Sequence, residues 1–71
     1  MRKRSISLKG HRTSIALEDA FWSALEEFAT SDECSLPQLI YEIDRTRIKE
    51  TPPPGLASAL RVYVLRRLTA S

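Results

Sequence analysis

The sequence has few residues that could cross-link the chain or hold a metal ion. Its 71 residues include one cysteine, Cys34, and one histidine, His11. These counts exclude an internal disulfide and any metal cage built from cysteine and histidine alone. A chain of this length buries only a modest share of its surface and is marginally stable by itself. We therefore expect a second subunit to supply additional core.

Long apolar runs are also absent. The basic segment "MRKRSISLKG" contains no apolar stretch long enough for a signal peptide, and no segment is long enough to cross a membrane. A lone thiol suits a reducing compartment. We expect a cytoplasmic protein that has no membrane partner.

Motifs that carry chemistry are missing as well. The sequence has no glycine-rich phosphate loop, no metal-ligand spacing and no nucleophile with an accompanying base. Cys34 lies in an acidic turn, and neighbouring carboxylates raise the pKa of a thiol, which disfavours a nucleophilic role. We therefore predict a protein that is not an enzyme and that uses no catalytic residue, cofactor or metal.

Charge is distributed unevenly, although the formal net charge is only +2. Residues 1–12 carry five bases and no acid, residues 13–44 carry eight acids and no base, and residues 45–71 carry six bases and one acid. A basic end on an acidic body is typical of a protein that binds nucleic acid through that end. A solvated, disordered tail is the alternative interpretation of the basic arm, residues 1–10.

The stretch "HRTSIALEDAFW" changes its hydrophobic period halfway. Two sets alternate along residues 11–17: Thr13, Ile15 and Leu17 on one side, and Arg12, Ser14 and Ala16 on the other. This two-residue repeat predicts a strand with one apolar face. "RSISL" in the basic arm also alternates, which leaves a short strand before Gly10 open. No stretch of comparable quality offers the strand at 11–17 a partner within the chain.

A first helix is predicted directly after this strand, over residues 18–30, because the apolar spacing becomes three and four residues. Glu18 and Asp19 lie in its first turn, where carboxylates favour the positive end of the helix dipole. The expected apolar stripe consists of Phe21, Leu25, Phe28 and Ala29, with Trp22 on its flank.

A second helix is predicted over residues 36–50. "SLPQ" is a capping box, with Ser35 as N-cap and Gln38 at the third position. The prolines of "TPPPG", residues 51–55, cannot supply backbone donors, so this segment ends the helix and forms a hinge. The C-terminal segment, residues 56–71, is apolar at helical spacing and predicts a third helix that must pack against something.

The residues "HRTSIALEDAFWSALEEFATSDECSLPQLIYEIDRTR" resemble a ribbon-helix-helix domain of the Arc/MetJ/CopG type. The shared pattern is a short alternating strand, a helix that begins with acids, a polar turn, and a Ser-capped second helix carrying "LPQLIYEI". More closely, "SLKGHRTSIALEDAFW" with the later "LASALRVYVL" resembles a bacterial subfamily of ribbon-helix-helix proteins. The resemblance covers about residues 4–66.

The resemblance implies a mainly α-helical fold with one short strand, in which two chains form an intertwined homodimer. The strand pairs antiparallel with its own copy, which satisfies backbone groups that lack a partner within the chain. The helix after the hinge is an addition to a ribbon-helix-helix core at residues 11–50. The implied dimer core contains Thr13, Ile15, Leu17, Phe21, Leu25, Leu39, Ile40 and Ile43.

The resemblance also implies DNA contacts, since a two-stranded ribbon fits the major groove. The implied base-contacting residues are Arg12, Ser14 and Ala16. The implied phosphate contacts are Arg2, Lys3, Arg4 and Lys9, together with Ser35 and Leu36 at the N-terminus of the second helix. On periodicity alone, Arg12 and Ser14 form a solvated strand face; the basic arm and the resemblance favour base contacts.

We therefore expect a small transcriptional regulator that binds double-stranded DNA sequence-specifically as a homodimer, or as several dimers side by side. One alternative is an antitoxin whose C-terminal helix binds a protein partner, the toxin. The other is a ribbon-helix-helix protein-interaction module without DNA binding. Order in residues 56–69 without a partner disfavours the antitoxin, and binding to duplex DNA disfavours the module.

Overall fold

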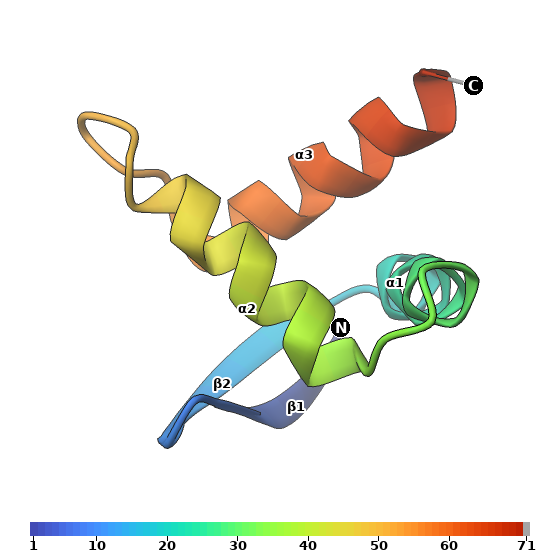
Figure 1. Cartoon of the computed structure of the whole chain (residues 1–71), viewed down its shortest axis with the longest axis horizontal. Coiled ribbons are helices and arrows are strands. Elements are labelled where there is room, and N and C mark those ends of the chain that lie inside the picture. The colour runs from blue at the N-terminus through green and yellow to red at the C-terminus, as the bar shows by residue number, and fades with distance from the viewer. Residues whose placement is uncertain (71) are drawn as a thin grey trace.

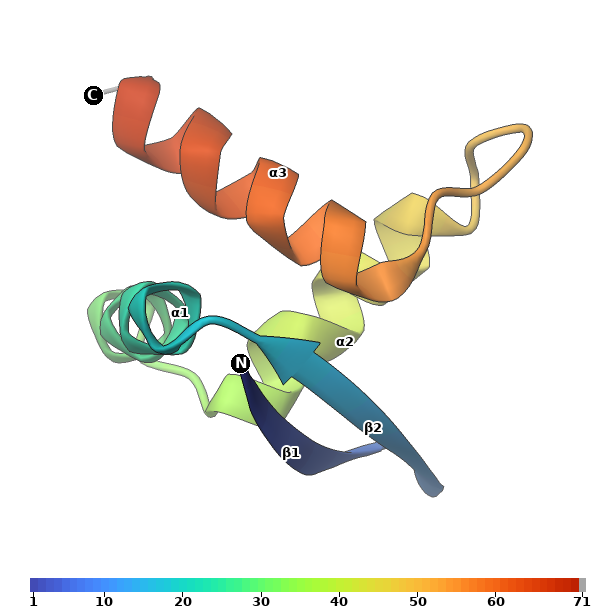
Figure 2. The same cartoon turned by 180° about the vertical axis from the view of Figure 1, so that it is seen from behind.

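The computed structural model describes residues 1–70, which form a two-stranded antiparallel sheet and three helices (Figure 1). The elements in chain order are β1 (Arg2–Leu8), β2 (His11–Leu17), α1 (Asp19–Ser31), α2 (Leu36–Arg47) and α3 (Leu56–Thr69). In both views α2 runs through the middle of the molecule, with the hairpin below it and α3 above it (Figures 1 and 2). One face of the sheet is covered by helices and the other is open.

The first two strands form a hairpin with a two-residue turn. Leu8 pairs with His11, and the register continues through Ser5 opposite Ser14. The turn residues Lys9 and Gly10 have φ of 49° and 92°. Positive φ at both central residues is the requirement of a type I′ turn, whose twist matches that of the flanking strands.

The expectation of a single short strand is therefore wrong, and so is that of a basic arm at residues 1–10. The pairing partner of β2 is β1 of the same chain, not a second copy of β2. The physical reason is that β1 has its own two-residue alternation, which places Ile6 and Leu8 on the helix-covered face beside Ile15 and Leu17. A second chain is therefore not needed to pair the backbone N–H and C=O groups along this edge of β2.

The helix boundaries follow from local chemistry. The Ser35 cap of α2 is confirmed, because its Oγ accepts a hydrogen bond from the backbone N–H of Gln38 at 3.2 Å. At its other end α2 finishes at Arg47, three residues before the expected end, and Lys49 and Glu50 bond back to carbonyls three residues earlier. Such bonds tighten the last turn of a helix.

One hydrophobic core joins the sheet and all three helices. Its fully buried large side chains are Trp22, Leu17, Leu25, Ile40 and Leu60. Trp22, expected on the flank of the stripe, is 1% exposed, and its Nε1 donates a hydrogen bond to the carbonyl of Arg2 at 2.9 Å. Thr13 and Phe21 are only half-buried. Because Leu60 comes from α3, this one chain encloses its own core.

Two arginines fasten α3 to the rest of the chain. Both terminal nitrogens of Arg67 donate hydrogen bonds to the carboxylate of Asp32 at 2.6 Å, and one also donates to the hydroxyl of Tyr63. Its guanidinium also lies 4.4 Å from the ring centroid of Phe28. Arg61 pairs with Glu18 at 3.0 Å. These contacts join α3 to both ends of α1.

The in-chain hairpin predicts the outcome of a disulfide experiment. Opposite residues on one face of an antiparallel pair have Cβ atoms about 4.5–5.5 Å apart. We expect Ser5→Cys with Ser14→Cys, in a Cys34→Ser background, to form an intramolecular disulfide on mild oxidation. Non-reducing electrophoresis should then show a single chain. The matched control is Ser14→Cys alone, and efficient disulfide-linked dimers from that variant would contradict the in-chain pairing.

The Arg67 contacts predict a loss of stability in acid. The pKa of Asp32 lies below its ordinary value of 3.8, because Arg67 donates hydrogen bonds to the carboxylate. This stabilisation is complete above pH 3.8. It is lost as the pH falls through the lowered pKa of Asp32, where the carboxylate of the folded protein takes up a proton. Arg67→Gln should therefore reduce the fall in melting temperature between pH 7 and pH 3. Arg45→Gln is the control, and an unchanged fall in the Arg67 variant would contradict the prediction.

Candidate nucleic-acid interface

The open face of the hairpin is polar. Alternation along both strands directs one set of side chains away from the helices, and we call this set the outer ribbon face: Lys3, Ser5, Ser7, Arg12, Ser14 and Ala16. All are exposed except Ala16, which is half-buried. The register aligns them in three cross-strand rows, Ser7 with Arg12, Ser5 with Ser14, and Lys3 with Ala16. The set contains two bases and no acid.

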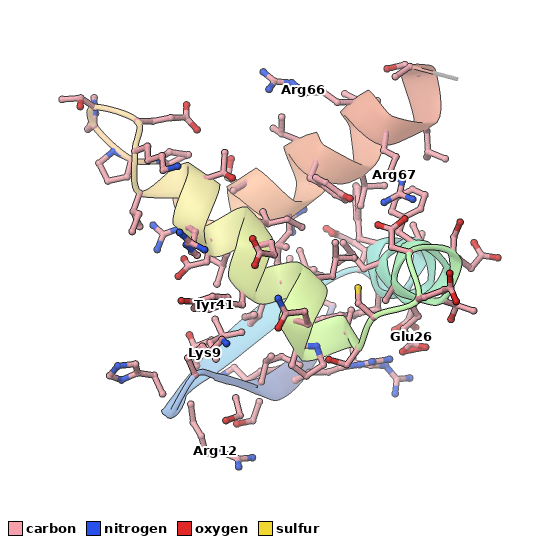
Figure 3. The ribbon with its side chains drawn as sticks, in the orientation of Figure 1. Lys9, Arg12, Glu26, Tyr41, Arg66 and Arg67 are labelled. Carbon is pink, nitrogen blue, oxygen red and sulfur yellow. The ribbon has the colours of Figure 1, made fainter. Side chains whose placement is uncertain are left out.

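Arg12 is the residue of this face with the most hydrogen-bond donors. Its side chain extends away from the three helices (Figure 3). Its Nε donates a hydrogen bond to the Oγ of Ser5 on the opposite strand at 3.3 Å. This bond orients an exposed guanidinium from the Nε side, so that the terminal nitrogens face solvent. Such a planar fork of donors matches acceptor pairs on guanine or phosphate.

Arg2 and Arg4 do not belong to a free arm. Both alternate onto the helix-covered side of β1, where Arg2 pairs with Asp19 at 2.8 Å and Arg4 with Glu26 at 2.6 Å. The Arg4 guanidinium also lies 4.8 Å from the ring centroid of Trp22. Both of these arginines, which were predicted to contact phosphate, are thus paired with acids of α1, and Arg4 also contacts an aromatic ring of that helix.

Lys9 and Lys3 occupy different positions on the hairpin. Lys9 lies in the turn, and its Nζ is 5.2 Å from the ring centroid of Tyr41 on α2, a contact visible at the tip of the hairpin (Figure 3). Lys3 lies at the other end, on the outer ribbon face. Of the four bases expected to contact phosphate, Lys3 is the one that shares a face with Arg12.

Helix α2 contacts β1, but its first turn is a weak anion site. The Oγ of Ser35 is already the acceptor of the N-cap bond, Leu36 is half-buried, and Pro37 has no N–H to offer. Glu33 is exposed just before the cap. A carboxylate near these amides competes with a phosphate for the positive end of the helix.

Sequence reasoning missed Ser5 and Ser7, and it placed Lys3 in a basic arm as a phosphate contact. The signal that could have found them is "SISLKGHRTSI", in which alternation resumes directly after Lys9 and Gly10. Two alternating runs separated by two residues, the second of them glycine, are typical of a hairpin. Pairing the runs through that turn places all six residues of the outer ribbon face together.

Other kinds of site receive no support from the described part of the chain. Residues 1–70 contain no group of three or more His, Cys, Asp or Glu side chains placed to hold a metal ion. None of the helices in that range is long and apolar enough to cross a membrane.

Comparison with known proteins identifies the family. A family model described as "Ribbon-helix-helix domain" matches residues 1–68. No curated protein and no solved structure matches the chain. Proteins of this family are generally DNA-binding regulators or antitoxins, generally bind DNA as dimers, and are typically not enzymes. The match covers both strands and nearly all of α3, which confirms the resemblance read from the sequence: this chain belongs to the ribbon-helix-helix family.

Proposed function

We propose that this protein binds double-stranded DNA sequence-specifically and acts as a small transcriptional regulator, with the outer ribbon face as its reading surface. The observation that carries the proposal is the composition of that face, which consists of two bases, three serines and an alanine on adjacent antiparallel strands. A two-stranded ribbon is one of the elements that the major groove admits.

The side chains of this face suit base edges. Arg12 can donate two hydrogen bonds to O6 and N7 of guanine, and serine hydroxyls can donate to or accept from several bases. Ser14 and Ser5 form the middle row, beside Arg12, so these three residues present adjoining donors and acceptors. Ala16 offers an apolar contact to a thymine methyl group. Lys3, in the same row, is placed to neutralise a phosphate at the groove wall.

The charge distribution supports the same orientation on DNA. Residues 1–17 contain five bases and no acid, and all nine acids follow them in the chain. Three acids of the segment 18–26 are neutralised in part: Glu18 by Arg61, Asp19 by Arg2 and Glu26 by Arg4. A polyanion approaching the outer ribbon face therefore meets a positive surface.

The alternative functions have less support. An antitoxin segment that waits for its toxin is not expected to be folded, whereas α3 packs Leu60 and Val64 into the core of its own chain. A protein-interaction module would not require the outer ribbon face to be free of acids. We also propose that the protein acts as a homodimer, in keeping with its family.

The proposal predicts a specific loss of affinity in an Arg12→Ala variant. The ligand is a fluorescent duplex selected from a random pool, and binding is measured by fluorescence polarisation at several salt concentrations. Losing a bidentate guanine contact should cost about 1–3 kcal/mol per contact and relax specificity at that base. Lys3→Ala should weaken binding to all duplexes alike and lower the salt dependence by about one phosphate contact.

The matched control is Lys49→Ala, which removes one exposed base from the segment after α2, far from the hairpin (Figure 1). Its affinity should change much less than that of the Arg12 variant. Equal losses of affinity in the two variants would show that binding depends only on the net charge of the protein. No binding by the unaltered protein, even at low salt, would overturn the proposal and favour the interaction module.

A further inference from the structure

The ring of Tyr41 on α2 attracts two cations, one from the hairpin and one from its own helix. The Lys9 Nζ is 5.2 Å from the ring centroid, and the guanidinium carbon of Arg45 is 5.9 Å from it. Tyr41 and Arg45 lie four residues apart on α2, so they share one face of this helix. Lys9 extends toward that face from the turn of the hairpin (Figure 3). We call Lys9, Tyr41 and Arg45 the tip cluster.

The tip cluster differs from the other cation–ring contacts because its cations lack an acid. Among residues 1–70, the other cations that lie over a ring each pair with a carboxylate at 3.0 Å or less: Arg4 with Glu26, Arg61 with Glu18, and Arg67 with Asp32. In the same range neither Lys9 nor Arg45 makes a side-chain hydrogen bond or ion pair. The two like charges near one ring repel each other, and an anion beside them would offset that repulsion.

The acids that adjoin Arg45 along α2 are already bonded elsewhere. The Glu42 carboxylate accepts a hydrogen bond from Gln38 at 3.0 Å, and Asp44 pairs with Arg47 at 2.6 Å. All the donors of the Lys9 ammonium and the Arg45 guanidinium are therefore available to an anion from outside the chain.

The backbone at Lys9 supports a role for its side chain in binding. Lys9 has φ of 49° at the first central position of the hairpin turn. Asparagine, aspartate and glycine are preferred there, because they adopt positive φ most readily. Other residue types held in this left-handed region occur disproportionately at ligand-binding sites. The chain thus accepts a less favourable turn residue, which brings an ammonium group to Tyr41.

We propose that the tip cluster binds a phosphate group, and that its occupant is a phosphodiester of the DNA backbone. Lys9 and Arg45 supply the positive charge. The Tyr41 hydroxyl supplies a further donor: it makes no hydrogen bond within residues 1–70, and it is open to solvent because no unbonded side-chain N or O atom in that range is buried. This inference rests on the proposed function and adds to it a backbone contact beside the outer ribbon face.

The position of the tip cluster fits a phosphate at the wall of the major groove. Lys9 and Arg12 lie at the same end of the hairpin, and their side chains leave it in different directions (Figure 3). Phosphates line the groove on both sides of a ribbon that reaches the base edges. The N-terminus of α2 is a weak anion site because of Pro37 and Glu33, and the tip cluster supplies cations further along the same helix.

The first test measures affinity for the selected fluorescent duplex, and for an unrelated duplex, at several salt concentrations. Lys9→Asn and Arg45→Gln should each weaken binding to both duplexes alike, by about fivefold, and lower the salt dependence by about one contact. Because both side chains hold one phosphate, the double variant should lose less affinity than the product of the two single losses. The matched control is Lys9→Asn with Lys49→Ala, in which the two losses should multiply.

A stability measurement distinguishes binding from a merely structural contact between the hairpin and α2. Asparagine is preferred at the first turn position, so Lys9→Asn should not lower the melting temperature although it weakens DNA binding. Tyr41→Phe keeps the ring and removes only the hydroxyl, and it too should weaken DNA binding without lowering the melting temperature. Lower melting temperatures with unchanged affinity in both variants would overturn the phosphate site.

Inorganic phosphate tests the same site without DNA. In two-dimensional NMR spectra at constant pH, phosphate should shift the backbone amide signals of Lys9 and Gly10, whereas sodium chloride at equal ionic strength should not. The double variant Lys9→Asn with Arg45→Gln should lose these shifts.

The two measurements separate failure of the site from failure of the proposed function. If the unaltered protein binds no duplex, phosphate shifts confined to the tip cluster uphold the site, and equal shifts at all exposed bases overturn it. If the protein binds duplex DNA and the Lys9 and Arg45 variants bind it as tightly, the site is overturned while the proposed function stands.

Discussion

The pairing of β1 with β2 through the Lys9–Gly10 turn determines what every other element does. It sets Ile6 and Leu8 beside Ile15 and Leu17, so that one face of the two-stranded sheet is apolar and packs against the helices. It also brings the Arg2 carbonyl to the indole nitrogen of Trp22, the largest buried side chain. Without this register the outer ribbon face would not exist, because its six residues come equally from both strands.

Helix α3 completes the hydrophobic core to which the hairpin contributes one face. Leu60 and Val64 fill the core from the side opposite the sheet, and Arg61 and Arg67 attach the helix to Glu18 and Asp32 at the two ends of α1. Helix α3 thereby contributes Leu60 and Val64 to a core for which the family resemblance implied a second chain. The outer side of α3, with Val62 and Leu65, is left exposed.

The sequence predicted those parts whose signals are local and complete. The alternation of residues 11–17, the Ser35 cap and the apolar C-terminal helix each correspond to an element with nearly the expected bounds. β1 was missed because its charges obscured its alternation: Arg2 and Arg4 face the acids of α1, a long-range pairing that no local pattern reveals. Lysine at the first turn position, in place of the more usual asparagine or glycine, hid the hairpin further.

The single-chain hairpin has an evolutionary consequence. When two identical strands from different molecules build a ribbon, each substitution appears twice, related by symmetry, and the recognised pattern is constrained to be palindromic. Here Lys3 faces Ala16 and Ser7 faces Arg12, so the two strands are unlike and can diverge independently. Within one hairpin, such a surface can therefore change one residue at a time, because a substitution on one strand leaves the opposite strand unchanged.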